Sequence, residues 1–348
     1  MANNELIVLN NEKVSRDGNT FYSRNYNFKI LPEGLNDHFN VKYFVRKSSI
    51  KENHKLDLPN IKIASNIIQF ICFVLSTFKN KNAKYFIITI SPYTFVAFIF
   101  LFIFRRKVFV YLISSGYEEW KYIIGSWSVW IYHLMYKIVT SNSVVIALHE
   151  RLIKKNKGYV INSSTLNNKW LSNLKNANLD KIRYLYVARL NPEKGIYEFL
   201  EMFKKIKFDA EISIIGKTKN LVLQEKFNNI IQNNKKIKFL GYISDRQKLI
   251  EIYDEHNILI LPSYTEGQPY VIDESLSRRR PVLIFEDIMH VVKGRKGIFI
   301  SKRNVESFTE MTKYILQNYK KIQKEIEQNK FPMEEDMFKQ ISDVIKKN

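Results

Sequence analysis

The stretch Ile258-Leu259-Ile260-Leu261-Pro262-Ser263-Tyr264-Thr265-Glu266-Gly267-Gln268-Pro269-Tyr270-Val271-Ile272-Asp273-Glu274 predicts a buried strand, a Gly/Pro loop and the start of a helix. It places two carboxylates, Glu266 and Glu274, at one strand-to-helix junction. A similar junction lies upstream, where the apolar run Tyr184–Ala188 leads into Arg189-Leu190-Asn191-Pro192-Glu193-Lys194-Gly195. Cations at one junction and carboxylates at the other suit a ligand that carries both phosphates and sugar hydroxyls, such as a nucleotide sugar.

Short apolar runs alternate with longer amphipathic segments on both sides of these junctions. This alternation is typical of βαβ units and parallel sheets, so the expected fold class is α/β. The strands expected in the first half are Leu6–Leu9, Val41–Val45, Tyr85–Ile90, Val108–Leu112 and Val144–Ala147. Those expected in the second half are Tyr184–Val187, Ala210–Ile215, Ile237–Leu240, Ile258–Leu261, Val282–Phe285 and Gly297–Ile300.

A chain of 348 residues exceeds the usual size of a single core, which predicts two domains. The polar, Asn-rich stretch 164–180 has the composition of a linker. We therefore expect an N-terminal domain over 1–168, a C-terminal domain over 169–330 and a C-terminal helix over 331–348.

The chain is strongly basic, with 55 Lys and Arg against 34 Asp and Glu and a net charge of +21. Nucleic acid, an anionic membrane surface or phosphorylated substrates would all favour such an excess, and so would a Lys- and Asn-rich genome. Nucleic acid is not expected as a partner, because the sequence has no RNP-like segment, zinc-finger spacing or basic heptads.

The single cysteine, Cys72, allows no intrachain disulfide, and the polar start of the sequence does not resemble a signal peptide. Both features predict a cytoplasmic location. The apolar run Tyr93–Phe104, followed by Arg105-Arg106-Lys107, is too short to span a bilayer. Two interpretations remain for this run: a helix buried in the α/β domain, or a shallow contact with anionic lipid headgroups.

The two junctions can each be given a chemical role. An Arg fork and a Lys point charge at the carboxyl edge of a parallel sheet can hold a diphosphate and offset its charge as it leaves. The carboxylate of Glu266 can accept hydrogen bonds from sugar or ribose hydroxyls. The alternative for Arg189 and Lys194 is a solvated loop, and the alternative for Glu266 and Glu274 is a helix N-terminal charge and a surface residue.

Three motifs in the second half resemble the retaining glycosyltransferases of the GT-B fold, family 4 (glycosyl transferases group 1). Arg189–Gly195 is similar to the basic phosphate motif of that family, and Leu261 through Glu274 to its paired-glutamate motif. The segment Ile237-Lys238-Phe239-Leu240-Gly241-Tyr242-Ile243-Ser244 looks like the part that lies along the nucleobase. The order and spacing of all three fit, over residues 184–300.

The resemblance implies two Rossmann-like domains that face each other across a cleft, with residues 1–168 binding the acceptor and residues 169–330 binding the nucleotide sugar. It also implies that the C-terminal helix over 331–348 crosses back to the first domain. It implies that Glu266 contacts the donor sugar, Glu274 the nucleotide ribose, and Arg189 and Lys194 the diphosphate. Catalytic roles are thus expected for Glu266, Arg189 and Lys194. The other donor-binding residues expected are Gly18, Gly216, Gly241, Tyr242, Gly267, Gln268 and Pro269. No cofactor and no metal are expected, because the cations do the electrostatic work in this family.

The sequence departs from the family pattern at several points. A small-Gly-basic-Pro-Val turn is replaced by Ser277-Arg278-Arg279-Arg280-Pro281-Val282, which predicts a different turn whose arginines face phosphate, lipid headgroups or solvent. Gln268 stands where an aromatic residue is usual. Val14–Thr20, with Gly18, resembles the glycine loop that follows the first strand. Ser114-Ser115-Gly116-Tyr117 stands where many relatives carry a histidine, so Ser115, Gly116 and Tyr117 are expected on the acceptor side.

The function expected from the resemblance is transfer of a hexose-type sugar, with retention, from a UDP, GDP or ADP donor to a hydroxyl acceptor. The basic, aromatic first half favours a membrane glycolipid, a lipid-linked saccharide or a lipopolysaccharide, with the protein peripheral on the inner face of the cytoplasmic membrane. The alternatives are a phosphorylase or an epimerase of the same fold, or a basic membrane- or nucleic-acid-binding module without catalysis.

Overall fold

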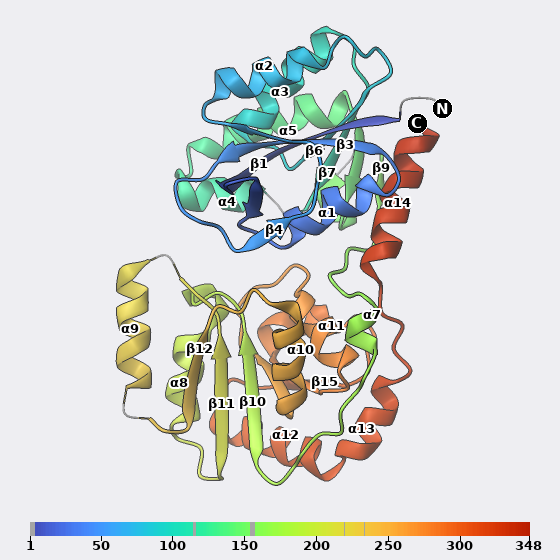
Figure 1. The fold of residues 1–348 in the computed structure, drawn as a ribbon. Coiled ribbons are helices and arrows are strands. Elements are labelled where there is room, and N and C mark those ends of the chain that lie inside the picture. Colours follow the sequence, from blue (N-terminus) through green and yellow to red (C-terminus); the bar gives the residue numbers. More distant parts are fainter. Residues whose placement is uncertain (1–3, 114–115, 154–156, 219, 233) are drawn as a thin grey trace. The chain divides into compact units, whose positions relative to one another are not determined.

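The computed structural model describes residues 4–113, 116–153, 157–218, 220–232 and 234–348. The chain divides into two compact units (Figure 1): unit 1 comprises Met1–Thr165 with Pro332–Asn348, and unit 2 comprises Leu166–Phe331. The sequence placed these boundaries after residues 168 and 330. Each unit is built around a mainly parallel sheet with helices, so the expected α/β class is confirmed.

Unit 1 is organised by parallel strands in the spatial order β5-β3-β1-β6-β7-β8-β9, with β2 and β4 joined antiparallel at the end of β1. The strands are β1 (Glu5–Asp17), β2 (Thr20–Ser23), β3 (Asn40–Lys47), β4 (His54–Leu56), β5 (Ile61–Ala64), β6 (Lys84–Ile88), β7 (Val108–Leu112), β8 (Val144–Ala147) and β9 (Gly158–Val160). The helices are α1 (Asn27–Asn36), α2 (Ile67–Ser76), α3 (Pro92–Ile103), α4 (Gly116–Ile123), α5 (Ser128–Ser141), α6 (Glu150–Ile153) and α14 (Glu334–Lys347).

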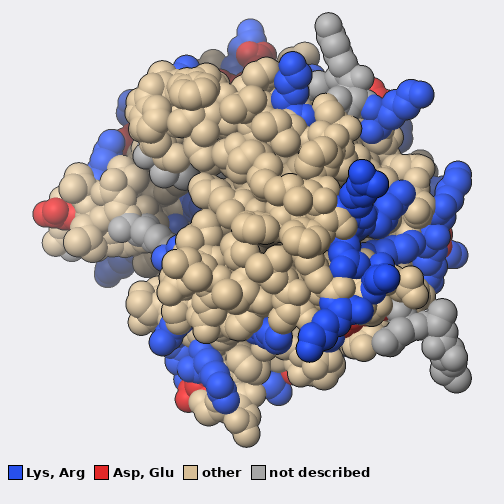
Figure 2. Space-filling view, turned by 90° about the horizontal axis from the view of Figure 1, so that it is seen from above, with Lys and Arg blue, Asp and Glu red and all other residues tan. Residues whose placement is uncertain are grey.

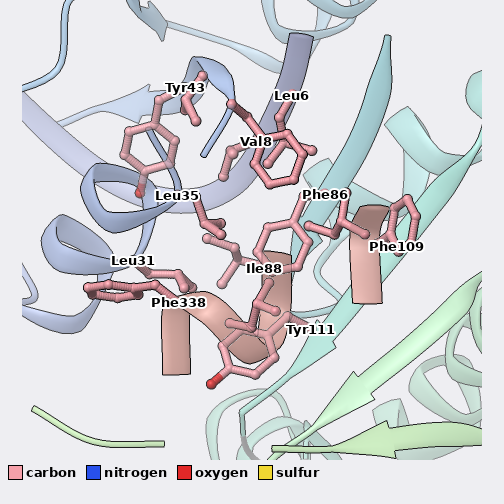
Figure 3. Close-up of a cluster of buried hydrophobic side chains, with 14 of the residues drawn as sticks. Leu6, Val8, Leu31, Leu35, Tyr43, Phe86, Ile88, Phe109, Tyr111 and Phe338 are labelled. Carbon is pink, nitrogen blue, oxygen red and sulfur yellow. The ribbon is translucent and has the colours of Figure 1, made fainter. Parts of the chain in front are cut away.

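The sheet of unit 1 is buried on both faces, because alternate residues of its strands point to opposite sides. Leu6, Val8 and Phe86 pack with residues of α1 and α14 in one cluster, shown in Figure 3. Their neighbours Ile7 and Tyr85 pack with α2, α3 and α5 in the other. The near-continuous apolar runs of the sequence therefore correspond to strands covered on both sides.

The C-terminal helix α14 completes the core of unit 1. Met337, Phe338 and Ile341 are buried against α1 and the sheet, and the Phe338 ring lies over Gly34 so closely that a Cβ there would clash. Lys84 of β6 donates a hydrogen bond to the carbonyl of Ile345 at 2.5 Å. Unit 1 is therefore assembled from two segments that are far apart in the sequence.

The first strand is longer than the sequence predicted. β1 continues to Asp17, and Gly18 with Asn19 forms the turn of a hairpin in which Asp17 pairs with Thr20 of β2. Gly18 adopts the left-handed conformation (φ 59°), which suits this two-residue turn. Gly18 therefore lies in a turn that directly follows the first strand, whereas Val14–Asp17 of the expected loop belong to the strand itself, and the donor-binding role of Gly18 stays a prediction. Residues 10–17 are mostly polar, so the sequence did not predict that the strand continues through them. A Gly-Asn pair between two strands is nevertheless a hairpin signal.

Unit 2 contains six parallel strands in the order β12-β11-β10-β13-β14-β15. They are β10 (Ile182–Val187), β11 (Ala210–Ile215), β12 (Ile237–Gly241), β13 (Ile258–Leu261), β14 (Val282–Phe285) and β15 (Ile298–Ser301). The helices are α7 (Asn168–Leu171), η1 (Pro192–Lys194), α8 (Ile196–Phe203), α9 (Leu221–Ile231), α10 (Arg246–Glu255), α11 (Tyr270–Ser277), η2 (Glu286–Val291), α12 (Val305–Gln317) and α13 (Tyr319–Ile326).

The stretch expected to be a linker is anchored to unit 2. Trp170 is completely buried, and the guanidinium of Arg278 donates hydrogen bonds to the carbonyls of Trp170, Ser172 and Asn173. Asp254 of α10 binds the same guanidinium at 2.9 and 2.7 Å. The expectation that Arg278 faces phosphate, lipid or solvent is wrong. The carboxylate and carbonyls around it replace water, as a buried charge requires.

The Arg-rich turn keeps the backbone geometry of a glycine turn. Arg280 is also buried, and it donates hydrogen bonds to the carbonyls of His256 and Asp254. Arg279 between them is half-buried, pairs with Glu327 and has φ 56°, the region that normally favours glycine. The prediction of a different turn is therefore wrong at this residue, because arginine occupies the left-handed position itself.

Candidate functional site

The strand order of unit 2 reverses between β10 and β13. The chain runs from β10 outward to β11 and β12, and then returns to the other side of β10 with β13. Ligands of open α/β sheets bind beyond the carboxyl ends of the strands at such a reversal. The two junctions identified in the sequence follow β10 and β13 directly, so both border this point.

The loops after β10 and β13 are in direct contact. Tyr264 donates its backbone N–H to the carbonyl of Glu193 at 3.0 Å. Gly195 (φ 65°) passes so close to the carbonyl of Pro262 that a Cβ would lie 2.0 Å from the oxygen. Only glycine fits this crossing, because both the conformation and the space exclude a side chain. The basic loop after β10 and the carboxylate loop after β13 are therefore packed together in fixed relative positions.

Lys194 and Glu266 form an ion pair across this contact. The Nζ of Lys194 lies 2.7 Å from Oε1 of Glu266, and the hydroxyl of Ser263 donates to the same oxygen at 2.7 Å. The side chains are only 15% and 9% exposed, so the attraction is less screened by water than at an open surface. Within the described parts of the chain, Oε2 of Glu266 accepts no hydrogen bond, which leaves acceptor capacity for a hydroxyl group.

Glu274 is a buried carboxylate on α11. Its Oε1 lies 2.8 Å from Nη1 of Arg246, and its Oε2 accepts a hydrogen bond from the hydroxyl of Tyr253 at 3.0 Å. Burial, together with this carboxylate, raises the pKa of Tyr253 well above its usual range, so Tyr253 remains a donor. Glu274 is thus fixed in position by α10, and the alternative of a surface residue is wrong.

Arg189 lies apart from the Lys194–Glu266 pair. Its side chain is 69% exposed, and its Nη2 lies 3.8 Å from Oε1 of Glu193. A long, exposed guanidinium of this kind is not held in one geometry. Its expected contact with a diphosphate stays a prediction.

The other donor-side residues expected in unit 2 lie at the ends of neighbouring strands. Gly216 follows β11 directly, and its N–H donates to the carbonyl of Gly241, the last residue of β12, at 3.0 Å. Tyr242 comes next and is 40% exposed, with the Nζ of Lys217 3.8 Å from the centre of its ring. Gly267, Gln268 and Pro269 form the loop that leads into α11.

The acceptor-side residues belong to unit 1. Ser115 lies outside the described residues. Gly116 is buried beneath the ring of Tyr132, and the hydroxyl of Tyr117 lies 2.9 Å from Nδ1 of His133. A histidine, His133 of α5, therefore lies beside Tyr117, although the sequence has none near position 115. Because His133 is distant from Tyr117 in the sequence, no local motif connects the two residues.

Three further residues of the unit 2 site were not among the site residues expected from the sequence. Arg246 holds Glu274, and His290 lies with Nε2 2.9 Å from the carbonyl of Glu266. Arg303 donates to the carbonyl of Pro262 at 3.0 Å and stacks on Tyr264, with its guanidinium 4.1 Å from the ring centre. These residues support the two loops from distant elements, which only the tertiary structure reveals.

Residues 181–318 match the family model described as glycosyl transferases group 1. Over 133 residues the chain is 26% identical to the capsular polysaccharide biosynthesis glycosyltransferase CapM of Staphylococcus aureus. That match takes in 36% of this chain and 34% of CapM, so the chain spans about a third of the length of the curated relative it matches.

Solved structures extend the likeness to the whole chain. Sucrose-phosphate synthase from Thermosynechococcus elongatus has a TM-score of 0.70 and 15% identity, covering 99% of this chain and 98% of the other. Anabaena Alr3699/HepE in complex with UDP has a TM-score of 0.67 and 11% identity, covering 99% and 100%. Identities this low show the fold alone. The structural similarity confirms the expected GT-B class.

Proposed function

Because residues 181–318 carry a domain of the glycosyl transferases group 1 family, we propose that the chain is a nucleotide-sugar-dependent glycosyltransferase. It transfers a hexose-type sugar to a hydroxyl acceptor with retention, as in family 4. The observation that carries this proposal is the Lys194–Glu266 pair at the strand-order reversal of unit 2. There a cation for phosphate and a carboxylate for sugar hydroxyls lie 2.7 Å apart.

Each residue has a chemical task in this proposal. Lys194 and the mobile fork of Arg189 bind the diphosphate and offset the charge that develops on it as the sugar leaves. Oε2 of Glu266 accepts hydrogen bonds from the donor sugar. Glu274, held in position by Arg246 and Tyr253, binds the ribose hydroxyls.

Retention follows if the acceptor attacks the face from which the diphosphate departs. The bond between the anomeric carbon and the phosphate oxygen breaks, and a bond from that carbon to the acceptor oxygen forms. The acceptor proton passes to the leaving phosphate. No enzyme nucleophile is required, and the cations supply the electrostatic stabilisation without a metal. Activity is accordingly expected to persist in EDTA.

UDP is the first donor nucleotide to test, because Alr3699/HepE is similar in fold and its structure holds UDP. The proposed acceptor is a membrane glycolipid, a lipid-linked saccharide or a lipopolysaccharide. Similarity to CapM, whose name refers to capsular polysaccharide biosynthesis, supports a glycan acceptor. We further propose that the protein works in the cytoplasm, peripheral on the inner membrane face.

The test combines binding with turnover. UDP, GDP and ADP are screened by thermal shift, since a ligand that binds only the folded state raises its stability. Turnover of the matching sugar nucleotide is then measured for the parent, Glu266→Ala and Lys194→Ala. Both variants are expected to lose about 10²- to 10³-fold in kcat. Glu266→Ala should keep affinity for the nucleotide without a sugar.

Lys204→Ala is the matched control, because Lys204 also forms an ion pair with a glutamate but is exposed at the C-terminal cap of α8. Product analysis with the donor alone, with and without phosphate, separates transfer from phosphorolysis and epimerisation. Full turnover by Glu266→Ala would refute the assigned site. A parent protein that neither binds nor turns over any sugar nucleotide would refute the function.

A further inference from the structure

Three helices of unit 1 lack the charged outer side that water-exposed helices normally present. α2, α3 and α5 pack on one face of the sheet, and among them they carry a single Lys, Arg, Asp or Glu, Lys137. Amphipathic helices of soluble domains place charged residues opposite the core. The outer side of these helices therefore has the character of an interface.

The outer positions of these helices are occupied by large apolar side chains. Ile68 is 73% exposed, Phe102 and Ile103 are 50% and 63%, and Trp130 and Leu134 are 64% and 50%. We call these five residues the apolar face. α2 contacts α3, and α3 contacts α5, so their outer sides adjoin. Viewed from above, tan surface without charge fills the middle of Figure 2.

Basic residues accompany the apolar face. Lys79 and Lys81 follow α2, and Arg105 and Lys107 follow α3; all four are exposed. From Leu58 to His149 the sequence contains nine Lys and Arg but only two acidic residues, adjacent glutamates in α4. Lys and Arg side chains also gather along one side of the tan surface in Figure 2.

We propose that the apolar face docks on an anionic lipid bilayer. Phe and Trp side chains would insert at the depth of the headgroups while the lysines and arginines bind lipid phosphates. None of the helices in the described parts of the chain combines the length and apolar character needed to cross a bilayer, so the contact lies in the interface plane. A second copy of the chain fits less well, because two basic rims and two net charges of +21 would meet.

Docking deepens the proposed function by presenting the enzyme to a membrane-bound acceptor, but it is measured without turnover. The parent protein is sedimented with sucrose-loaded vesicles of phosphatidylcholine alone or with about 30% phosphatidylglycerol. Strong partitioning is expected only with phosphatidylglycerol, and it should weaken in about 0.5 M salt because headgroup attraction is screened. Tryptophan emission should shift to the blue on binding, since Trp130 leaves water.

The variant Phe102→Ser/Ile103→Ser is expected to lower the partition coefficient at least tenfold. Its control is Leu221→Ser/Val222→Ser, which removes apolar side chains that are 84% and 73% exposed on α9 of unit 2. Arg105→Glu/Lys107→Glu should abolish the preference for phosphatidylglycerol, whereas Lys320→Glu/Lys321→Glu on α13 should retain it. A thermal unfolding profile that matches that of the parent confirms that each variant is folded.

Three results would overturn the proposal. The first is that the parent protein fails to bind anionic vesicles. The second is that the α9 control, Leu221→Ser/Val222→Ser, loses as much binding as the α3 variant, Phe102→Ser/Ile103→Ser. Alternatively, the parent would be a stable dimer in light scattering that Phe102→Ser/Ile103→Ser dissociates, which would assign the face to a second copy. Sugar transfer to a soluble acceptor by a protein that ignores vesicles would refute docking and leave the enzymatic proposal intact.

Discussion

Arg279 shows at the scale of one residue how a motif can be replaced while its backbone is kept. Its φ of 56° costs an L-residue about 1 kcal/mol, and its ion pair with Glu327 is half exposed. We therefore expect Arg279→Gly to raise the free energy of unfolding by about 0.5–1 kcal/mol. Arg279→Ala keeps the strain and loses the ion pair, so it should not stabilise. Urea denaturation of both variants measures the difference, and equal stabilities would contradict the strain.

Glu12 of β1, near the hairpin, is a buried carboxyl that should make the free energy of unfolding depend on pH. Burial, opposed by a hydrogen bond from the N–H of Asn25 at 2.9 Å, raises the pKa of this carboxyl from 4.5 to about 7. The folded state therefore holds a proton that the unfolded state has released between these two values. The stability gained from the neutral carboxyl is complete below the unfolded pKa and is lost as the pH rises through about 7.

Glu12→Gln keeps a neutral acceptor at that position and should remove this pH dependence. The free energy of unfolding of the parent relative to Glu12→Gln should fall by about 3 kcal/mol between about pH 4.5 and pH 8. Denaturation at both pH values provides the measurement. A constant difference would show that folding does not raise the pKa of Glu12.

The sequence was informative about residues whose partners lie in a neighbouring loop. Lys194 and Glu266 were identified because each follows an apolar strand, and parallel strands bring their carboxyl ends to one edge. Arg246 and Arg303 were missed because their contacts depend on helix packing far from either loop. Local pattern cannot specify such contacts.

At the scale of elements, Asp254 of α10 ties the segment around Trp170 to unit 2 through Arg278. Both side chains are buried, so removing the carboxylate leaves an uncompensated guanidinium. We expect Asp254→Ala to lower the free energy of unfolding of unit 2 by about 3–5 kcal/mol. Asp209→Ala, in which the lost carboxylate is 70% exposed, should change it by less than about 0.5 kcal/mol. Similar losses in both variants would contradict a structural role for the buried pair.

Strand positions were predicted well, and connections were not. Every expected strand is present because residues buried on both faces give continuous apolar runs. The β1–β2 hairpin and the anchoring of residues 166–175 escaped prediction, because both segments are rich in polar residues whose order depends on hydrogen bonds. A polar composition therefore predicts a loop only where the segment is not buried by the rest of the fold.

At the scale of the whole molecule, the two units have separate cores and should unfold in separable transitions. Phe338→Ala removes a ring buried over Gly34, so it should destabilise unit 1 by about 3 kcal/mol and leave unit 2 unchanged. A bound nucleotide should raise only the transition of unit 2. Calorimetry of the parent and the variant, with and without UDP, tests both statements. A single transition that moves as a whole would show that the units unfold together.

The return of α14 to unit 1 also has a consequence during synthesis. Residues 4–165 leave the ribosome first, but the helix that closes their core is translated only after all of unit 2. Unit 2 can fold first, while the earlier segment waits with its α1-facing sheet surface uncovered. Nascent chains that end at residue 331 should therefore depend on chaperones or aggregate, even though they contain every strand that the structure describes.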